Sequence, residues 1–172
     1  MDEDAQRVAL YMHRYKLLRE IGELQVESVT NESVFLTQCC GLLLQEPEYC
    51  LVCVGQKESE GTITPVTIVV QDGLPLRQCR ELLQQSVQET SAANCAAQAI
   101  AKGEPVVVAL NGQSSSQPLN LLMTVTGSRS CGSWPLVHNQ QNYGVLTIHS
   151  IRASGFTGIE FDFITNVAAI IS

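Results

Sequence analysis

The sequence lacks any apolar run of the roughly 18 to 20 residues that a membrane-spanning helix requires. It also lacks the features of a secretory signal, because its first residues, MDEDAQR, are acidic where such a signal would be basic and then apolar. These two absences predict a cytoplasmic protein and no membrane contact by this segment.

Basic residues are scarce. The chain has 10 Lys and Arg against 17 Asp and Glu, which gives a net charge of −7, and no cluster of Lys and Arg forms an obvious face. Such a balance repels phosphate backbones and anionic lipid surfaces. We therefore expect no nucleic-acid partner.

Motifs that bind metal or carry electrons are also missing. The seven cysteines are an odd number scattered through apolar segments, which is typical of reduced thiols packed in a core. Cys50 and Cys53 have a C-x-x-C spacing, but YCLVCVG is typical of a strand, where residues i and i+3 point in opposite directions. No combination of cysteine and histidine gives a zinc-binding spacing, so we expect no metal site.

No arrangement of residues typical of catalysis is recognisable. The sequence contains no G-x-S-x-G, H-E-x-x-H or G-x-x-x-x-G-K-[ST] motif. Its three histidines are divided between the first expected helix and a later hairpin. The sequence therefore predicts no catalytic residues and a protein that is not an enzyme.

The alternation of apolar, polar and turn residues predicts one α+β domain over residues 1–172. Two amphipathic helices are expected within residues 1–45. A mainly antiparallel sheet with inserted helices is expected over residues 49–151, where β-branched stretches alternate with helical patterns. Within it, residues 112–118, GQSSSQP, are expected to form a loop, and residues 119–127 fit either a short strand or a turn of helix.

The end of the chain, residues 157–172, is expected to form a helix. Thr157 and Glu160 have the T-x-x-E spacing of a capping box, flanked by two phenylalanines at the positions of a hydrophobic staple. No Gly, Asn or Pro ends this helix before Ser172. We therefore expect the natural chain to continue beyond this helix; the alternative is a natural C-terminus at a helix that frays.

The C-terminal part of the sequence resembles the second half of a GAF domain. That family typically shows a small-residue-led strand ending in Pro-Leu, a polar turn, a Gly-Val-Leu strand, and a Phe shortly before an acid-containing amphipathic helix. Upstream, AAQAIAKGEPVVV is similar to the segment in which a GAF helix ends at Gly before a Pro-Val strand. The residues that match in order and spacing are Ser133, Pro135, Leu136, Gly144, Val145, Leu146, Phe156 and Glu160.

The resemblance covers nearly the whole chain in the order of its elements. It implies a GAF-like fold with a central antiparallel sheet of about six strands, the N- and C-terminal helices on one face, and a small-molecule pocket on the other. It also implies a homodimer through the terminal helices. The output domain would be that of a bacterial-type signalling protein, such as a sensor histidine kinase of a two-component system or a cyclic-di-nucleotide regulator.

The chain departs from several GAF subfamilies. Cys79 is followed by Arg80, whereas bilin-binding relatives place His directly after the anchoring Cys, so we expect no covalent bilin. The N-K-F-D-E signature of cyclic-nucleotide-binding members is absent. Free methionine sulfoxide reductases share the fold and use cysteines, but their cysteine-containing motifs do not match this chain. An enzyme of that kind would require two cysteines within reach of one another in a cleft. The sequence does not identify a cofactor.

Alternation along the strand YGVLTIHS selects two candidate pocket residues. Leu146 and Ile148 form the more apolar face, which suits packing against the terminal helices, so Thr147 and His149 are expected to face the pocket. His149 also falls where the His of a similar G-L-L-I-A-H strand faces the ligand in bilin-binding relatives. The alternative is a His149 that a neighbouring backbone group or solvent satisfies.

Three further residues are candidates for ligand binding. Trp134, the only tryptophan, lies on the adjacent expected strand and is either a ligand platform or a core residue. Arg129 lies in TGSRSCGS, a turn that either holds an anion or is simply exposed. Arg80, on an expected middle helix, has the same two interpretations.

The leading hypothesis is a sensory GAF-type domain that binds a small molecule non-covalently and signals through its paired terminal helices. The alternative is a degenerate GAF module, with its pocket filled by its own side chains, that acts only as a dimerisation scaffold. These hypotheses differ in whether a cavity exists on the face that bears Thr147 and His149. The sequence does not identify the ligand.

Overall fold

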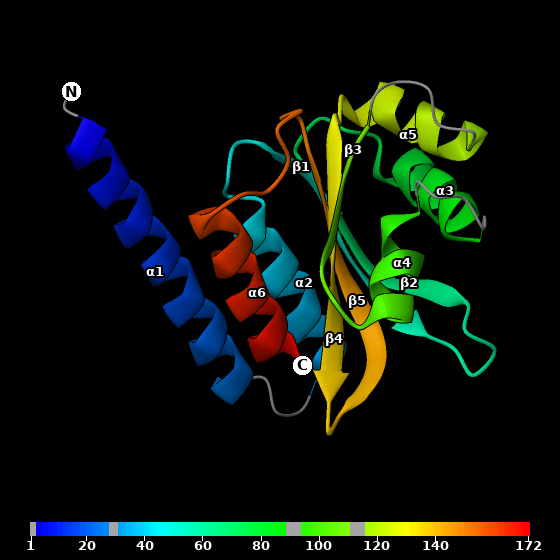
Figure 1. The fold of residues 1–172 in the computed structure, drawn as a ribbon, viewed down its shortest axis with the longest axis horizontal. Coiled ribbons are helices and arrows are strands. Elements are labelled where there is room, and N and C mark those ends of the chain that lie inside the picture. Colours follow the sequence, from blue (N-terminus) through cyan, green and yellow to red (C-terminus); the bar gives the residue numbers. More distant parts are fainter. Residues whose placement is uncertain (1–2, 28–30, 89–93, 111–115) are drawn as a thin grey trace.

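The computed structural model describes residues 3–27, 31–88, 94–110 and 116–172. It consists of one antiparallel sheet between two layers of helices, with the sheet seen edge-on in Figure 1. The helices are α1 (Glu3–Glu27), α2 (Glu32–Leu43), α3 (Leu76–Val87), α4 (Cys95–Lys102), α5 (Gln117–Thr126) and α6 (Ile159–Ile171). The strands are β1 (Tyr49–Lys57), β2 (Ile63–Val70), β3 (Val106–Ala109), β4 (Ser130–His138) and β5 (Gln141–Ser150).

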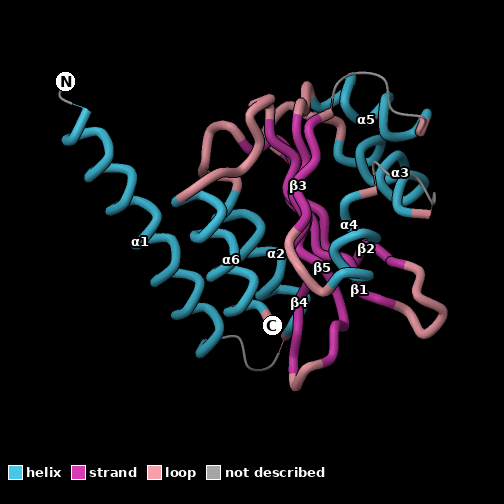
Figure 2. Tube along the Cα trace, in the orientation of Figure 1, coloured by secondary structure: helices cyan, strands magenta, loops and turns pink. Residues whose placement is uncertain are grey.

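The sheet has the strand order β2-β1-β5-β4-β3, and every neighbouring pair is antiparallel. The predicted α+β class is confirmed, with five strands among the described residues where about six were expected. β5 is the central strand, with β1 and β4 beside it, and these three strands are buried along most of their length. Figure 2 shows the sheet between the two layers of helices. The loop predicted for residues 112–118 lies partly outside the described residues, and residues 119–126 are part of α5.

The terminal helices pack on one face of the sheet, as predicted (Figure 1). Leu17 and Ile21 of α1 are fully buried there, together with apolar residues of α2 and α6. Leu146 and Ile148 of β5 contribute to the same core, which confirms the prediction from strand alternation. The core between these helices and the sheet is the larger of the two that flank it.

The opposite face is covered by α3, α4 and α5 (Figure 1). Its core is smaller and rich in cysteine, with Cys53, Cys79, Cys95 and Cys131 buried among leucines from α3 and α5. Apolar packing here is interrupted by polar side chains from β4 and β5, which are buried as well. This interruption creates the site described below.

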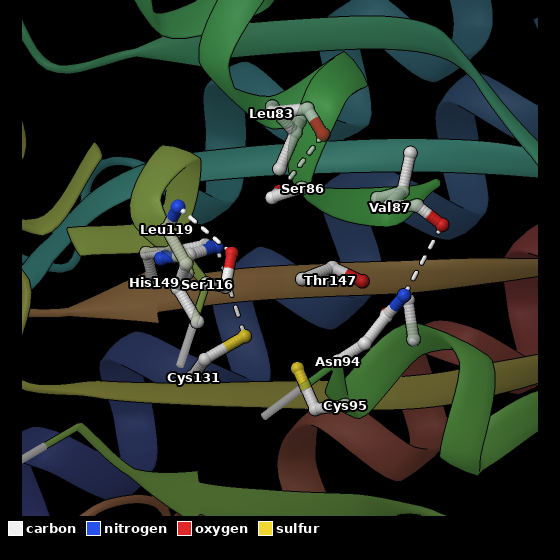
Figure 3. A pocket seen from close by; sticks show the side chains of 11 residues that line it. Leu83, Ser86, Val87, Asn94, Cys95, Ser116, Leu119, Cys131, Thr147 and His149 are labelled. Carbon is white, nitrogen blue, oxygen red and sulfur yellow. Dashed lines mark hydrogen bonds between the residues drawn. The ribbon is translucent and has the colours of Figure 1, made fainter. Parts of the chain in front are cut away.

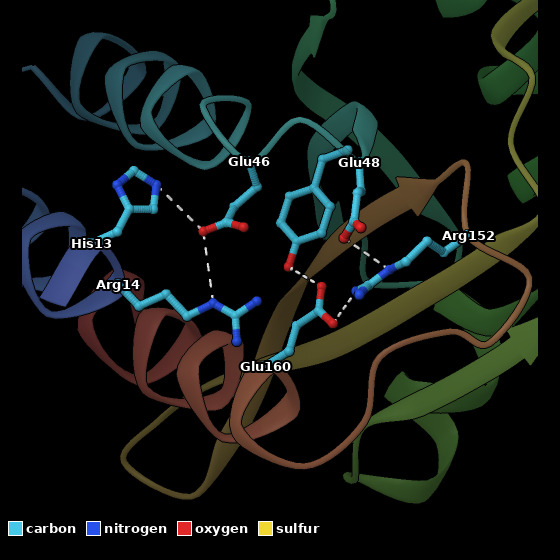
Figure 4. Close-up of polar contacts among 7 residues, drawn as sticks. His13, Arg14, Glu46, Glu48, Arg152 and Glu160 are labelled. Carbon is cyan, nitrogen blue, oxygen red and sulfur yellow. Dashed lines mark hydrogen bonds and ion pairs between the residues drawn. The ribbon is translucent and has the colours of Figure 1, made fainter. Parts of the chain in front are cut away.

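The start of α6 differs from the prediction. Its N-cap is Gly158, and no side chain caps it, so the expected capping box between Thr157 and Glu160 is wrong. The buried Glu160 carboxylate instead accepts a hydrogen bond from the Tyr49 hydroxyl at 2.8 Å and pairs with the Arg152 guanidinium (Figure 4). Long-range partners from β1 and from the segment after β5 outcompete the local cap because the carboxylate is buried and requires charge compensation.

A second ion pair connects α1 to the end of α2. The guanidinium of Arg14, almost fully buried, lies 3.7 Å from the carboxylate of Glu46, and His13 lies 3.5 Å from the same oxygen (Figure 4). Arg14 also lies 5.7 Å from the centroid of the Phe163 ring of α6, within range of a cation–π interaction. The long first helix is therefore fixed to α2 and α6 by charged groups as well as by its apolar residues.

Candidate functional site

A pocket lies between the sheet and the layer of α3, α4 and α5, on the face opposite the terminal helices (Figure 3). Its walls come from α3, the beginnings of α4 and α5, and the neighbouring strands β4 and β5. None of the described residues that line it is Asp, Glu, Lys or Arg. Its polar groups beyond α3 belong to Asn94, Cys95, Ser116, Cys131, Thr147 and His149.

The cavity is small, with a volume of about 30 Å³, which is room for one or two water molecules. Pockets for drug-sized ligands typically have volumes of about 300 to 1,000 Å³. In this form the pocket therefore admits only a molecule of a few non-hydrogen atoms. A larger ligand requires α3 or α5 to move away from the sheet.

Two helix caps fix the rim of the pocket. The side-chain oxygen of Asn94 accepts a hydrogen bond from the Ala97 amide at 3.1 Å, while its amide nitrogen donates to the Val87 carbonyl at 3.1 Å. The Ser116 hydroxyl accepts a hydrogen bond from the Leu119 amide at 3.2 Å. These caps start α4 and α5 at the pocket and, through Asn94, fasten α4 to the end of α3.

A row of polar contacts crosses the floor of the pocket from β4 to β5. The hydroxyl oxygens of Ser133 and Thr147 are 2.8 Å apart, and the Ser133 hydroxyl donates to the Cys95 sulfur at 3.1 Å. The Cys131 sulfur lies 3.6 Å from Nε2 of His149. The register of the hairpin sets this row, because Ser133 is opposite Thr147 and Cys131 is opposite His149.

His149 is a neutral side chain in the wall of the pocket. Burial lowers its pKa to about 4, because no water is available to solvate the charged imidazolium. Its Nδ1 atom is buried and has no hydrogen-bond partner among the described residues. The pocket thus offers an uncharged imidazole with one unused nitrogen.

Acid should destabilise the protein through His149. Because the pKa of His149 is about 4 when folded and about 6.5 when unfolded, the unfolded chain binds more protons between these values. We expect the free energy of unfolding to fall by about 2 kcal/mol from pH 6.5 to pH 4.5 through this residue alone. Urea titrations over this range should show a shallower fall for His149→Gln than for the wild type. His138→Gln, at an exposed histidine, should follow the wild type, and equal slopes for both variants would contradict the prediction.

The structure separates the five candidate site residues. Thr147 and His149 line the pocket. Trp134 lies on the other face of the sheet, in the core beneath α6. Arg129, at the turn before β4, and Arg80, on α3, are exposed and outside the pocket lining.

Sequence reasoning missed four polar residues of the pocket. Asn94 and Ser116 are helix caps, a role that their position before α4 and α5 could have revealed. Cys131 could have been assigned to the pocket face because the hairpin register places it opposite His149. Cys95 could have been assigned there because it is the first residue of α4. The regular alternation of side chains that was expected along YCLVCVG does not extend through Cys50, because a β-bulge interrupts β1 between Tyr49 and Leu51.

Comparison with known families identifies the fold. A family model described as the GAF domain matches residues 4–172. The chain belongs to the GAF family. A search of the curated proteins finds no match. Within the described residues, no group of three or more His, Cys, Asp or Glu side chains is placed to hold a metal ion, and no helix is long and apolar enough to cross a bilayer.

Solved GAF structures from both regulatory proteins and enzymes share this fold. The GAF domain of a phosphoenolpyruvate-protein phosphotransferase from Coxiella burnetii has a TM-score of 0.70 at 15% identity, covering 93% of this chain and 90% of that one. A free methionine-R-sulfoxide reductase from Neisseria meningitidis, in complex with its substrate, has a TM-score of 0.66 at 16% identity, covering 92% and 85%. The fRMsr of Staphylococcus aureus, also with substrate, has a TM-score of 0.66 at 14% identity, covering 92% of both chains.

The similarity to reductases overturns the prediction that the chain is not an enzyme. That prediction depended on the absence of familiar catalytic motifs, but GAF-fold enzymes of nearly the same extent exist. Identities of 14 to 16% establish a common fold and leave the chemistry to be argued from the residues of this chain.

Proposed function

We propose that this GAF domain is a cytoplasmic sensory or regulatory module that binds a small uncharged molecule non-covalently in the pocket beside Thr147 and His149. The observation that carries the proposal is the convergence of buried polar groups from several elements on one cavity, including an imidazole with an unpartnered nitrogen. An uncharged ligand suits the site because none of the described lining residues is Asp, Glu, Lys or Arg and His149 is neutral.

The signal would leave through the terminal helices. Thr147 and His149 alternate on β5 with Leu146 and Ile148, which pack in the core beneath α1, α2 and α6. A ligand that shifts or twists β5 therefore changes the surface on which these helices rest. We propose that α6 passes this change to an output domain of a signalling protein.

Native mass spectrometry of the purified domain, before and after incubation with cell extract, tests the binding role. We expect an adduct that survives gentle conditions and disappears on denaturation. Thr147→Val removes a pocket hydroxyl at nearly constant volume and should lose the adduct, while Thr124→Val, on the exposed side of α5, should retain it. A clean spectrum for the wild type under all conditions would favour the scaffold alternative.

The N-terminal half of α1 is proposed to form a homodimer. Val8, Tyr11, Met12 and Tyr15 have helical spacings that place them on one stripe, and they are 46 to 68% exposed. A second copy of this chain would cover such a stripe through its own α1, as in paired amphipathic helices. The dimer would hold two α6 helices in a fixed arrangement toward their output domains.

Tyr15→Glu should weaken this dimer. A carboxylate within the stripe has to be desolvated in each copy, so we expect the dissociation constant to rise roughly tenfold or more. Sedimentation velocity over a range of concentrations measures the change. Leu121→Glu, at an exposed leucine of α5 on the opposite side of the sheet, should leave it unchanged. A dimer that tolerates Tyr15→Glu but not Leu121→Glu would place the interface on the other layer.

A further inference from the structure

The pocket contains a pair of cysteines that non-covalent ligand binding does not use. Cys95 is the first residue of α4, Cys131 lies on β4, and both are almost fully buried. Both cysteines line the pocket, and Figure 3 shows both sulfur atoms at the same cavity. The Ser133 hydroxyl, two residues from Cys131 on β4, donates to the Cys95 sulfur at 3.1 Å. Two cysteines from different elements thus lie in one cleft, as thiol chemistry would require.

The surroundings of Cys95 favour its thiolate. Hydrogen bonds from the Cys131 thiol and the Ser133 hydroxyl lower the pKa of Cys95, although burial opposes them. Backbone amides at the start of α4 also hydrogen bond to its sulfur. By contrast, burial raises the pKa of Cys39 and of Cys53 to about 12, so these thiols remain protonated and unreactive.

We propose that Cys95 is a peroxide-reactive thiol and that Cys131 resolves its oxidised form to a Cys95–Cys131 disulfide. The Cys95 thiolate attacks one oxygen of a hydroperoxide, the O–O bond breaks, and the leaving hydroxide or alkoxide takes up a proton. Cys95 is then a sulfenic acid. The Cys131 sulfur attacks the Cys95 sulfur, the S–O bond breaks, and the departing hydroxide takes the Cys131 proton to form water. In sum, two thiols and one hydroperoxide give one disulfide, one water and one alcohol or second water.

The size and charge of the cavity select the oxidant. A volume of about 30 Å³ accommodates hydrogen peroxide, which is hardly larger than water. A free amino-acid sulfoxide is much larger than this cavity, and its carboxylate would find no Lys or Arg among the described residues of the lining. The pocket therefore fits a small uncharged hydroperoxide and not a charged amino-acid oxidant.

Intact-mass and peptide analysis of the full 172-residue chain tests this proposal. The reduced protein is treated with hydrogen peroxide, and free thiols are then blocked under denaturing conditions. Before blocking, we expect a loss of about 2 Da in the intact mass, and after blocking one cross-linked peptide that joins Cys95 to Cys131. Cys131→Ser should instead gain about 16 Da at Cys95, and a dimedone probe should trap this sulfenic acid. Cys95→Ser should show neither change.

Controls separate this pair from general thiol oxidation. Cys39→Ala, behind the sheet, should react as the wild type does. Free methionine sulfoxide in place of peroxide should leave the wild-type thiols reduced, and its reduction by the protein would overturn the choice of oxidant. A wild-type peptide map without the Cys95–Cys131 cross-link, or with a cross-link between other cysteines, would overturn the proposal whatever the variants do. These measurements require no bound ligand, so they test the cysteine pair independently of the proposed sensory role.

Discussion

Replacing Trp134 with alanine should lower the free energy of unfolding by about 4 kcal/mol, the typical cost of removing a large buried aromatic side chain. Trp134 is 1% exposed, and its indole is in edge-to-face contact with Phe156, with ring centroids 5.3 Å apart. Its indole nitrogen also donates to the Thr165 hydroxyl at 3.2 Å. The alanine variant loses the packing, the aromatic pair and this link from β4 to α6 together.

Urea unfolding followed by circular dichroism measures this effect, because the variant contains no tryptophan for fluorescence. Leu121→Ala, at an exposed leucine, should stay within about 0.5 kcal/mol of the wild type. If the Trp134→Ala protein kept its stability but failed to retain a ligand, Trp134 would be a binding residue. That result would contradict its position in the core beneath α6.

Arg152→Met should lower the free energy of unfolding by about 3 kcal/mol, since it leaves the buried carboxylate of Glu160 without its cationic partner. The guanidinium is about one-third exposed and also pairs with Glu48 at 2.8 Å, so this value lies at the lower end of the range for buried ion pairs. The Tyr49 hydroxyl remains as the only donor to Glu160 that the described contacts provide.

A double-mutant cycle with Glu160→Gln distinguishes the ion pair from side-chain packing. If charge compensation dominates, Arg152→Met should cost much less in the Glu160→Gln background than in the wild type. Arg129→Met, at an exposed arginine, serves as the control and should change stability by less than about 0.5 kcal/mol. Additive costs for the two changes would show that the two side chains act independently.

Local patterns predicted the layers of this fold well. Alternation along β5 assigned Leu146 and Ile148 to the helix face, and the structure confirms that assignment. Residues 119–126 were ambiguous because a short apolar run fits a buried strand and a buried helix equally. Only the cap at Ser116 and the left-handed Gly127 at the other end identify α5 as a helix.

The errors concern groups that depend on distant partners. Glu160 was expected to cap its own helix, yet Tyr49, 111 residues earlier in the chain, supplies its hydrogen bond. The pocket was only half predicted for the same reason. Cys95 meets Ser133 across 38 residues, and no local spacing reveals that contact. Periodicity determines which side of an element faces inward, whereas the register between elements determines which side chains meet.

Alternation along β5 also has an evolutionary consequence. Thr147 and His149 contact the pocket, while Leu146 and Ile148 support the helix layer, so one strand carries two surfaces that can be changed independently. Under the proposed sensory role, a descendant that substitutes Thr147 or His149 would change which molecule binds, while Leu146 and Ile148 keep their packing beneath the terminal helices. On that proposal, the ligand could diverge while the response is kept, because the two roles belong to adjacent positions of a single strand.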